Sequence, residues 1–215
     1  MTTQFPAPVV RFDASRSLPW LLILFAGSGC SALIYEIVWF QLLQLAIGST
    51  SVSLGFLLAT FMGGLCLGSL ALPRVQRLKY EHPLRVYAAL EFGIGLCGIV
   101  VLFALPFINR VYVAGAESGL PGMLLRGMIS AICLLPPTIL MGASLPAIVR
   151  GIESTPRGVS WWSLLYGANL GGAIFGTLFA GFYLLRIYNM ATATYVAAAI
   201  NIVVATLSFA LAGME

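Results

Sequence analysis

The sequence predicts an all-α, polytopic membrane protein whose six transmembrane helices form two inverted three-helix repeats. Hydrophobic residues make up 60% of the 215 residues and charged residues only 8%, with a mean hydropathy of +0.99. A soluble domain needs far less apolar sequence to bury one core. Mostly apolar segments recur between short polar breaks, and each reaches the roughly 20 residues with which a helix crosses a bilayer. The runs are continuous rather than alternating, which disfavours a β-barrel.

The polar breaks divide the chain into a short leading segment and six spans. Residues 1–17 are expected to form a cytoplasmic N-terminal segment, and residues 18–213 a transmembrane domain with halves at about 18–108 and 120–213. The predicted spans are about 18–47, 50–73, 84–108, 120–149, 160–185 and 190–213. No soluble catalytic domain is expected within these residues.

The first span has some features of a cleaved signal peptide. Arg11 and Arg16 precede an apolar stretch that reaches the small residues Gly27, Ser28 and Gly29. The apolar run continues to Ile47, however, which is too long for a signal sequence, and Gly27 stands where a lipoprotein signal before Cys30 usually has leucine. We therefore expect an uncleaved first helix.

The basic residues predict the orientation of the chain. Of the 11 Lys and Arg residues, eight lie on the side that the two termini share in a six-span topology: Arg11, Arg16, Arg74, Arg77, Lys79, Arg85, Arg150 and Arg157. Positive residues collect on the cytoplasmic side, so both termini are expected in the cytoplasm. The net charge of +4 is then a topology signal, and no nucleic-acid partner is expected.

The cysteines and the histidine predict neither a metal site nor a disulfide. Each of the first four spans holds one cysteine: Cys30, Cys66, Cys97 and Cys133. They form no CxxC pair and are expected to fill space as small apolar side chains. The single histidine, His82, lies in a basic loop beside Pro83. No cofactor is expected.

The repeat is predicted from features at equivalent places in the two halves. The second span carries small residues at Ala59, Gly63, Gly64 and Gly68, and the fifth carries glycines at 167, 171, 172 and 176. Such faces let helices approach closely in lipid. Because three crossings reverse the direction of the chain, the second half must be inverted, an arrangement common in transporters.

The first and fourth spans are both interrupted. The first contains Gly27–Ser31, and the fourth contains Pro136 and Pro137. Proline removes an amide donor and clashes with the preceding turn, which predicts a helix break at Pro136 and Pro137 that faces the first helix. Paired interruptions point to a membrane binding site, although packing curvature is the plain alternative.

Three ionisable residues lie within the spans: Glu36, Glu91 and Arg126. Glu36 shares a helix face with Gly29, Ala32 and Gln44, so it is expected to point into the bundle. Three interpretations remain open for Glu36: an ion pair with Arg126, a ligand or proton site, and an unpaired protonated acid. The candidate ligand-binding residues are Glu36, Tyr35, Trp39, Glu91, Arg126 and Asn169.

Four stretches resemble the membrane region of bacterial spermidine synthase-like (polyamine aminopropyltransferase-like) proteins. They are Ser31–Trp39, Phe61–Ser69, Pro136–Pro146 and Tyr166–Asn169, in the order of that family. After Asn169 the family commonly reads Thr-Leu-Gly-Ala, where this chain has Leu170-Gly171-Gly172-Ala173. The resemblance covers residues 18–213 and implies the bacterial inner membrane, with a transporter-like region beside a cytoplasmic aminopropyltransferase-type domain.

The resemblance implies an anchoring role and a small-molecule ligand. Spermidine synthases hold their nucleotide with a glycine-rich strand, turn and helix, and no such segment occurs in these 215 residues. This chain alone is therefore not expected to be an enzyme. It would be the membrane part of a longer protein or a separate membrane subunit, anchoring the transferase and binding or passing a polyamine or a related molecule.

A second resemblance concerns the loop from Gly68 to Lys79. It is similar to the basic loop between the second and third helices of major facilitator transporters, although it lacks their aspartate. Six helices are half of such a transporter, so transport would require a homo-oligomer or another pathway. The alternative to the anchoring role is thus a transporter-like half-module or a structural subunit of a larger complex.

Overall fold

A computed structural model describes residues 14–75, 82–113, 120–149 and 156–214. These residues form helices joined by short connections, which confirms the predicted all-helical class. The helices are α1 (Ala14–Ile47), α2 (Thr50–Val75), α3 (Pro83–Val113), α4 (Leu120–Val149), α5 (Pro156–Phe179), the π-helical segment η2 (Ala180–Leu184), α6 (Leu185–Ile187) and α7 (Met190–Met214).

Six stretches of the described residues are long and apolar enough to cross a membrane. They are Leu18–Ile47, Thr50–Arg74, Pro83–Phe107, Pro121–Val149, Ser160–Ile187 and Met190–Met214. Each boundary lies within two residues of the sequence prediction. The agreement follows from composition, since helix ends coincide with the polar breaks. The helix α1 itself begins at Ala14, inside the predicted N-terminal segment, and residues 1–13 lie outside the described residues.

Two short turns connect helices at one end of the bundle. Between α1 and α2 the chain turns at Gly48, whose φ of 80° is in the left-handed region that favours glycine. Before α7 the side chain of Asn189 accepts a hydrogen bond from the backbone amide of Thr192 at 2.8 Å. This is the N-cap arrangement that satisfies an otherwise unpaired amide at a helix start.

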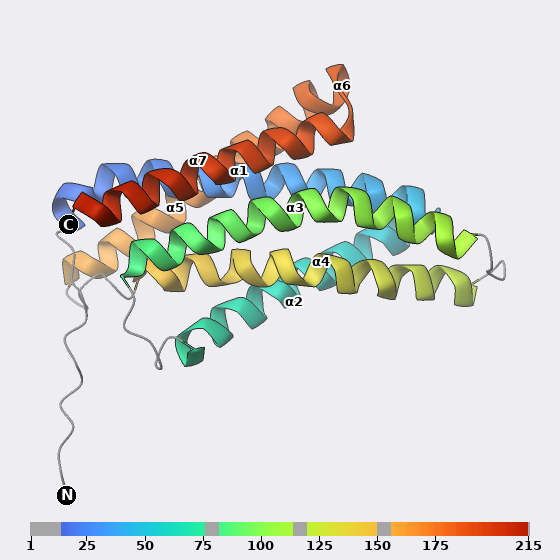
Figure 1. The fold of residues 1–215 in the computed structure, drawn as a ribbon, viewed down its shortest axis with the longest axis horizontal. Coiled ribbons are helices and arrows are strands. Elements are labelled where there is room, and N and C mark those ends of the chain that lie inside the picture. Colours follow the sequence, from blue (N-terminus) through green and yellow to red (C-terminus); the bar gives the residue numbers. More distant parts are fainter. Residues whose placement is uncertain (1–13, 76–81, 114–119, 150–155, 215) are drawn as a thin grey trace, which may run out of the picture.

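The helices form an elongated bundle in which the start of α1 and the end of α7 lie at the same end (Figure 1). The most extensive contacts are between α2 and α4 and between α1 and α5, followed by α3 with α7, α3 with α4 and α1 with α7. Helices from the first half of the sequence thus pack mainly on helices from the second half.

Glycines permit close approach in the two most extensive helix contacts. A Cβ at Gly172 of α5 would overlap the carbonyl oxygen of Ala26 in α1. A Cβ at Gly29 of α1 would overlap the carbonyl oxygen of Asn169 in α5. The α2–α4 contact is built in the same way, with Gly68 against Ile139 and Gly142 against Leu65. In contrast, Gly63, Gly167 and Gly171 meet nothing within 4 Å, so only some of the small residues singled out in the sequence serve helix packing.

The predicted break of α4 is wrong, because the helix runs without interruption from Leu120 to Val149. Pro136 and Pro137 both lie inside it. Transmembrane helices tolerate proline when neighbouring helices and hydroxyl side chains support the backbone. Here α4 packs against α2 and α3, and the Thr138 hydroxyl donates to the carbonyl oxygens of Leu134 and Leu135 at 3.0 and 2.9 Å.

An irregular segment occurs instead in the fifth span. The helix changes at Ala180 to a π-helical turn that ends at Leu184, and the backbone amide of Leu185 donates to the Ala180 carbonyl. The sequence prediction did not include this turn. The side chains of Ala180 and Leu184 face the core, while Phe182 is 71% exposed toward the outside of the bundle.

Candidate functional site

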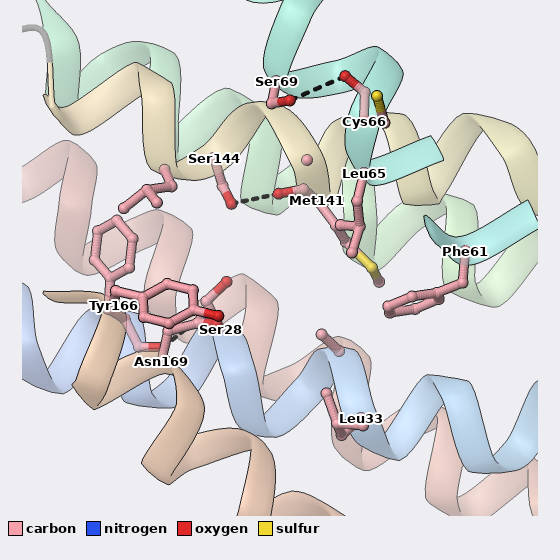
Figure 2. Close-up of a pocket in the computed structure, with 14 residues that line it drawn as sticks. Ser28, Leu33, Phe61, Leu65, Cys66, Ser69, Met141, Ser144, Tyr166 and Asn169 are labelled. Atoms are coloured by element: carbon pink, nitrogen blue, oxygen red, sulfur yellow. Dashed lines mark hydrogen bonds between the residues drawn. The ribbon is translucent and has the colours of Figure 1, made fainter. Parts of the chain in front are cut away.

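A cavity of about 410 Å³ lies between α1, α2, α4 and α5. Its walls combine helices of both halves of the chain. Most lining side chains are apolar, and serines, a tyrosine and an asparagine supply the polar groups (Figure 2). The lining residues are Phe25, Ser28, Ala32, Leu33, Phe61, Leu65, Cys66, Ser69, Met141, Gly142, Ser144, Leu145, Tyr166 and Asn169.

The four stretches that carry the family resemblance meet at this cavity. Every lining residue except Phe25 and Ser28 belongs to Ser31–Trp39, Phe61–Ser69, Pro136–Pro146 or Tyr166–Asn169. These stretches are far apart in the sequence and lie on four different helices. Their convergence makes the cavity the candidate site of the molecule.

The polar side chains gather toward one end of the cavity. Ser144, Tyr166 and Asn169 lie together in Figure 2, whereas Phe61 and Leu33 lie toward the other end. The hydroxyl of Ser144 donates to the carbonyl oxygen of Met141 at 2.6 Å. The Asn169 amide nitrogen donates to the carbonyl oxygen of Phe25 at 3.1 Å. This bond joins α5 to α1 and keeps the predicted site residue Asn169 on the cavity wall.

Glu36 lies one helical turn beyond the lining residues Ala32 and Leu33 on α1, a rise of about 5 Å. Its side chain is half-buried. Within the described part of the chain, its carboxylate takes part in no hydrogen bond or ion pair. Glu36 lies one turn beyond the apolar end of the cavity. A carboxylate at membrane depth is costly unless a cation or proton compensates it, and the described residues supply no such cation to Glu36.

The ion pair between Glu36 and Arg126 does not form. The Arg126 guanidinium donates instead to the carbonyl oxygen of Ala46 at 3.3 Å. Ala46 is ten residues beyond Glu36 on α1, which corresponds to about 15 Å along the helix. Arg126 therefore supports the end of α1, where the last carbonyl groups lack helical partners, and is remote from the cavity.

Tyr35 and Trp39 are core residues rather than part of the cavity lining. Both are fully buried, and their rings stack with centroids 5.3 Å apart. Tyr35 packs against Gly98 of α3. The neighbours of Glu36 in sequence therefore point to another face of α1.

Glu91 is the most deeply enclosed of the three ionisable residues, with no exposed surface. The Ser28 hydroxyl on α1 donates to its Oε1 atom at 2.6 Å, and the Asn201 amide nitrogen on α7 donates to its Oε2 atom at 2.6 Å. The Tyr87 hydroxyl lies beside the same carboxyl group. Glu91 thus joins three helices, and Ser28 connects it to the cavity.

Ser28 and Asn201 were missed in the sequence. Asn201 carries the one amide side chain of the sixth span, whose other polar residues are hydroxyl side chains, and it is fully buried, so its residue type was a usable signal. Ser28 resembled the small residues around it and gave no separate signal. Among the described residues, no cluster of three or more His, Cys, Asp and Glu side chains could hold a metal ion.

Comparison with known proteins gives no relative. No protein-family model, no curated protein and no solved structure matches this chain.

Proposed function

We propose that this chain is an integral membrane module that binds a small linear amine of the polyamine class in the cavity between its two halves. The observation that carries the proposal is the convergence of the four family-like stretches on one cavity. The resemblance to spermidine synthase-like proteins extends the proposal to an anchor for a cytoplasmic aminopropyltransferase-type domain in the bacterial inner membrane.

The distribution of polar groups favours a linear amine. The cavity is apolar in its middle and has hydroxyl and amide groups at one end, and its other end lies one helical turn along α1 from Glu36. An alkyl diamine matches this order, because it carries a methylene chain between two ammonium groups. One ammonium would meet Glu36, and the other would donate to oxygen atoms of Ser28 and its neighbours.

Binding of amines to purified protein tests this proposal. Spermidine and diaminooctane should raise the unfolding temperature, since a ligand that binds only the folded state stabilises it. Octanediol has the same length without charge and should have little effect. Charge-assisted hydrogen bonds contribute about 1.5–3 kcal/mol, so Glu36→Gln should weaken diamine binding by roughly 10- to 100-fold.

Paired variants locate the ligand. Ala32→Leu places added side-chain volume at the cavity wall and should block diamine binding. Ala59→Leu adds the same volume on an exposed face of α2 and should leave binding unchanged. If both variants bind diaminooctane like the unchanged protein, or if octanediol binds equally well, the proposed site is wrong.

The packing of the helices favours a second function, transport by two inverted repeats. Ala26 and Gly29 of α1 correspond to Ile139 and Gly142 of α4 at one constant offset in residue number. Leu65 and Gly68 of α2 correspond to Asn169 and Gly172 of α5 at a second constant offset. With these offsets the α1–α5 contact reproduces the α4–α2 contact, glycine for glycine. A site between inverted repeats is typical of alternating-access transporters. Uptake of labelled spermidine by proteoliposomes tests this function, with Ala32→Leu as the inactive control.

A further inference from the structure

We propose that Glu91 is a proton-binding site coupled to the amine site through Ser28, so that binding of the amine weakens binding of the proton and the reverse. The coupling rests on the proposed amine-binding function. The proton site itself rests on the buried cluster of Glu91, Ser28 and Asn201, which holds with or without an amine.

The first step concerns the charge of Glu91. The carboxyl group has no exposed surface, and its hydrogen-bond partners Ser28 and Asn201, like the neighbouring Tyr87 hydroxyl, are uncharged. An ionised carboxylate without a cation is costly in a dry interior. A proton removes this cost and needs no additional space.

The ionisable groups that the structure describes around Glu91 supply no compensating charge. Arg126, the one basic side chain described on α4 within the spans, lies at the end of α1 beside Ala46. The other titratable side chains described on the helices packed around Glu91 are acids, thiols or phenols, apart from Arg85, which is exposed at the start of α3. They are Cys30, Tyr35 and Glu36 on α1, Tyr87 and Cys97 on α3, Cys133 on α4 and the exposed Tyr195 on α7.

The second step concerns Asn201, whose side-chain oxygen is buried and has no hydrogen-bond partner. Its amide nitrogen and oxygen can exchange places by rotation of the side chain, since the two are nearly equivalent in shape. In one orientation the nitrogen donates to ionised Glu91, as the structure has it. In the other the oxygen accepts the hydroxyl of protonated Glu91. The cluster therefore has a hydrogen-bonding arrangement for each protonation state.

The third step is the link to the cavity. Ser28 lines the cavity and donates its hydroxyl hydrogen to Glu91 at 2.6 Å. While Ser28 donates to ionised Glu91, its oxygen lone pairs are available to an ammonium group in the cavity. When Glu91 is protonated and donates to Ser28, the serine hydroxyl hydrogen turns toward the cavity and opposes an ammonium. Amine binding therefore releases the proton of Glu91, and by linkage protonation weakens amine binding.

Two measurements on the full chain in lipid nanodiscs test these steps. Infrared spectroscopy reports a protonated carboxylic acid by its C=O stretching band. The band of Glu91 should be lost in Glu91→Gln, retained in Glu36→Gln and shifted in frequency in Ser28→Ala, which removes its hydrogen bond. If Glu91→Gln removes no such band at any pH at which the protein is folded, the proton site is wrong.

Proton release on addition of spermidine, followed with a pH indicator in weak buffer, tests the coupling. The unchanged protein should release up to one proton per spermidine bound and bind spermidine up to tenfold more tightly per unit rise in pH. Glu91→Gln should bind spermidine without releasing a proton, and Ser28→Ala should release less.

Each remaining outcome has a distinct meaning. Spermidine binding without proton release, or release that persists in Glu91→Gln, would overturn the coupling while leaving the amine site intact. If spermidine, diaminooctane and octanediol all fail to bind, the proposed function and the coupling both fall, and the infrared band alone decides whether Glu91 holds a proton.

Discussion

The two acidic side chains described within the spans occupy opposite environments. Glu91 accepts hydrogen bonds from two other helices and is fully buried, whereas Glu36 is half-buried and has no polar partner among the described residues. A buried group that satisfies several partners is a structural element as well as a chemical one, because its removal leaves those partners without hydrogen bonds. Glu36 lacks this structural role, which leaves its charge available for a ligand.

This contrast predicts different effects on stability. Glu91→Ala should lower the free energy of unfolding by about 2–4 kcal/mol, because it opens a cavity and leaves Ser28 and Asn201 without an acceptor. Glu36→Ala should change it by less than about 1 kcal/mol in the absence of amine. Unfolding of the purified protein in mixed micelles measures both. Equal losses for the two variants would contradict the structural role of Glu91.

Sequence reasoning identified these residues but not their partners. Charged groups at membrane depth stand out in any apolar span, so Glu36, Glu91 and Arg126 could be found without a structure. Their partners depend on which helix faces meet. The proposed pairing of Glu36 with Arg126 considered depth alone, and it failed because Arg126 lies about three turns farther along α1, beside Ala46.

At the scale of the helices, the sequence likewise does not show which helix faces meet, and this decides which glycines serve packing. Gly171 and Gly172 are adjacent in sequence, and both belonged to predicted small-residue faces. Gly172 lies against the α1 backbone, while Gly171 meets nothing within 4 Å. Only the helix arrangement distinguishes them. The continuous α4 illustrates a similar limit, because the effect of Pro136 and Pro137 depends on how α2 and α3 support the helix.

The two neighbouring glycines provide a matched test of the α1–α5 contact. Gly172→Ala forces a methyl group against the carbonyl of Ala26 and should cost about 1–3 kcal/mol of stability, as overpacking does. Gly171→Ala should be neutral or slightly stabilising, because alanine favours a helix over glycine by up to about 1 kcal/mol. Thermal unfolding in one detergent compares the two variants. Similar unfolding temperatures would mean that α1 and α5 are not in close contact at Gly172.

The proposed inverted repeat extends this test to the contact between α2 and α4. If α2–α4 is the counterpart of α1–α5, Gly68→Ala should cost about as much as Gly172→Ala, because Gly68 meets the Ile139 carbonyl as Gly172 meets that of Ala26. Gly63→Ala is the matched control on α2, since its added methyl group meets nothing within 4 Å. A neutral Gly68→Ala variant beside a destabilised Gly172→Ala variant would argue against equivalent contacts.

At the scale of the whole molecule, the number and limits of the spans were predictable because they follow from composition along the chain. The bilayer requires about 20 apolar residues per crossing, and polar breaks mark where each crossing ends. The cavity was not predictable in this way, since its lining comes from four helices whose contacts are set by glycine positions and side-chain shape. The four family-like stretches named most of its residues without indicating that they meet.

The orientation of the bundle follows from its even number of spans and its basic residues. The start of α1, the end of α7 and the start of α3 lie toward one end of the bundle (Figure 1). Arg85 is exposed at the start of α3, and Arg74 is exposed in the last turn of α2. We expect this end to be cytoplasmic, because positive residues near span ends are retained on that side. In a bacterial host, a fluorescent reporter fused after Glu215 should be active and a phosphatase at the same position inactive. A phosphatase inserted at Gly48 should be active, which controls for expression. Phosphatase activity after Glu215 would exclude this topology and with it the cytoplasmic placement of any transferase domain that the membrane module anchors.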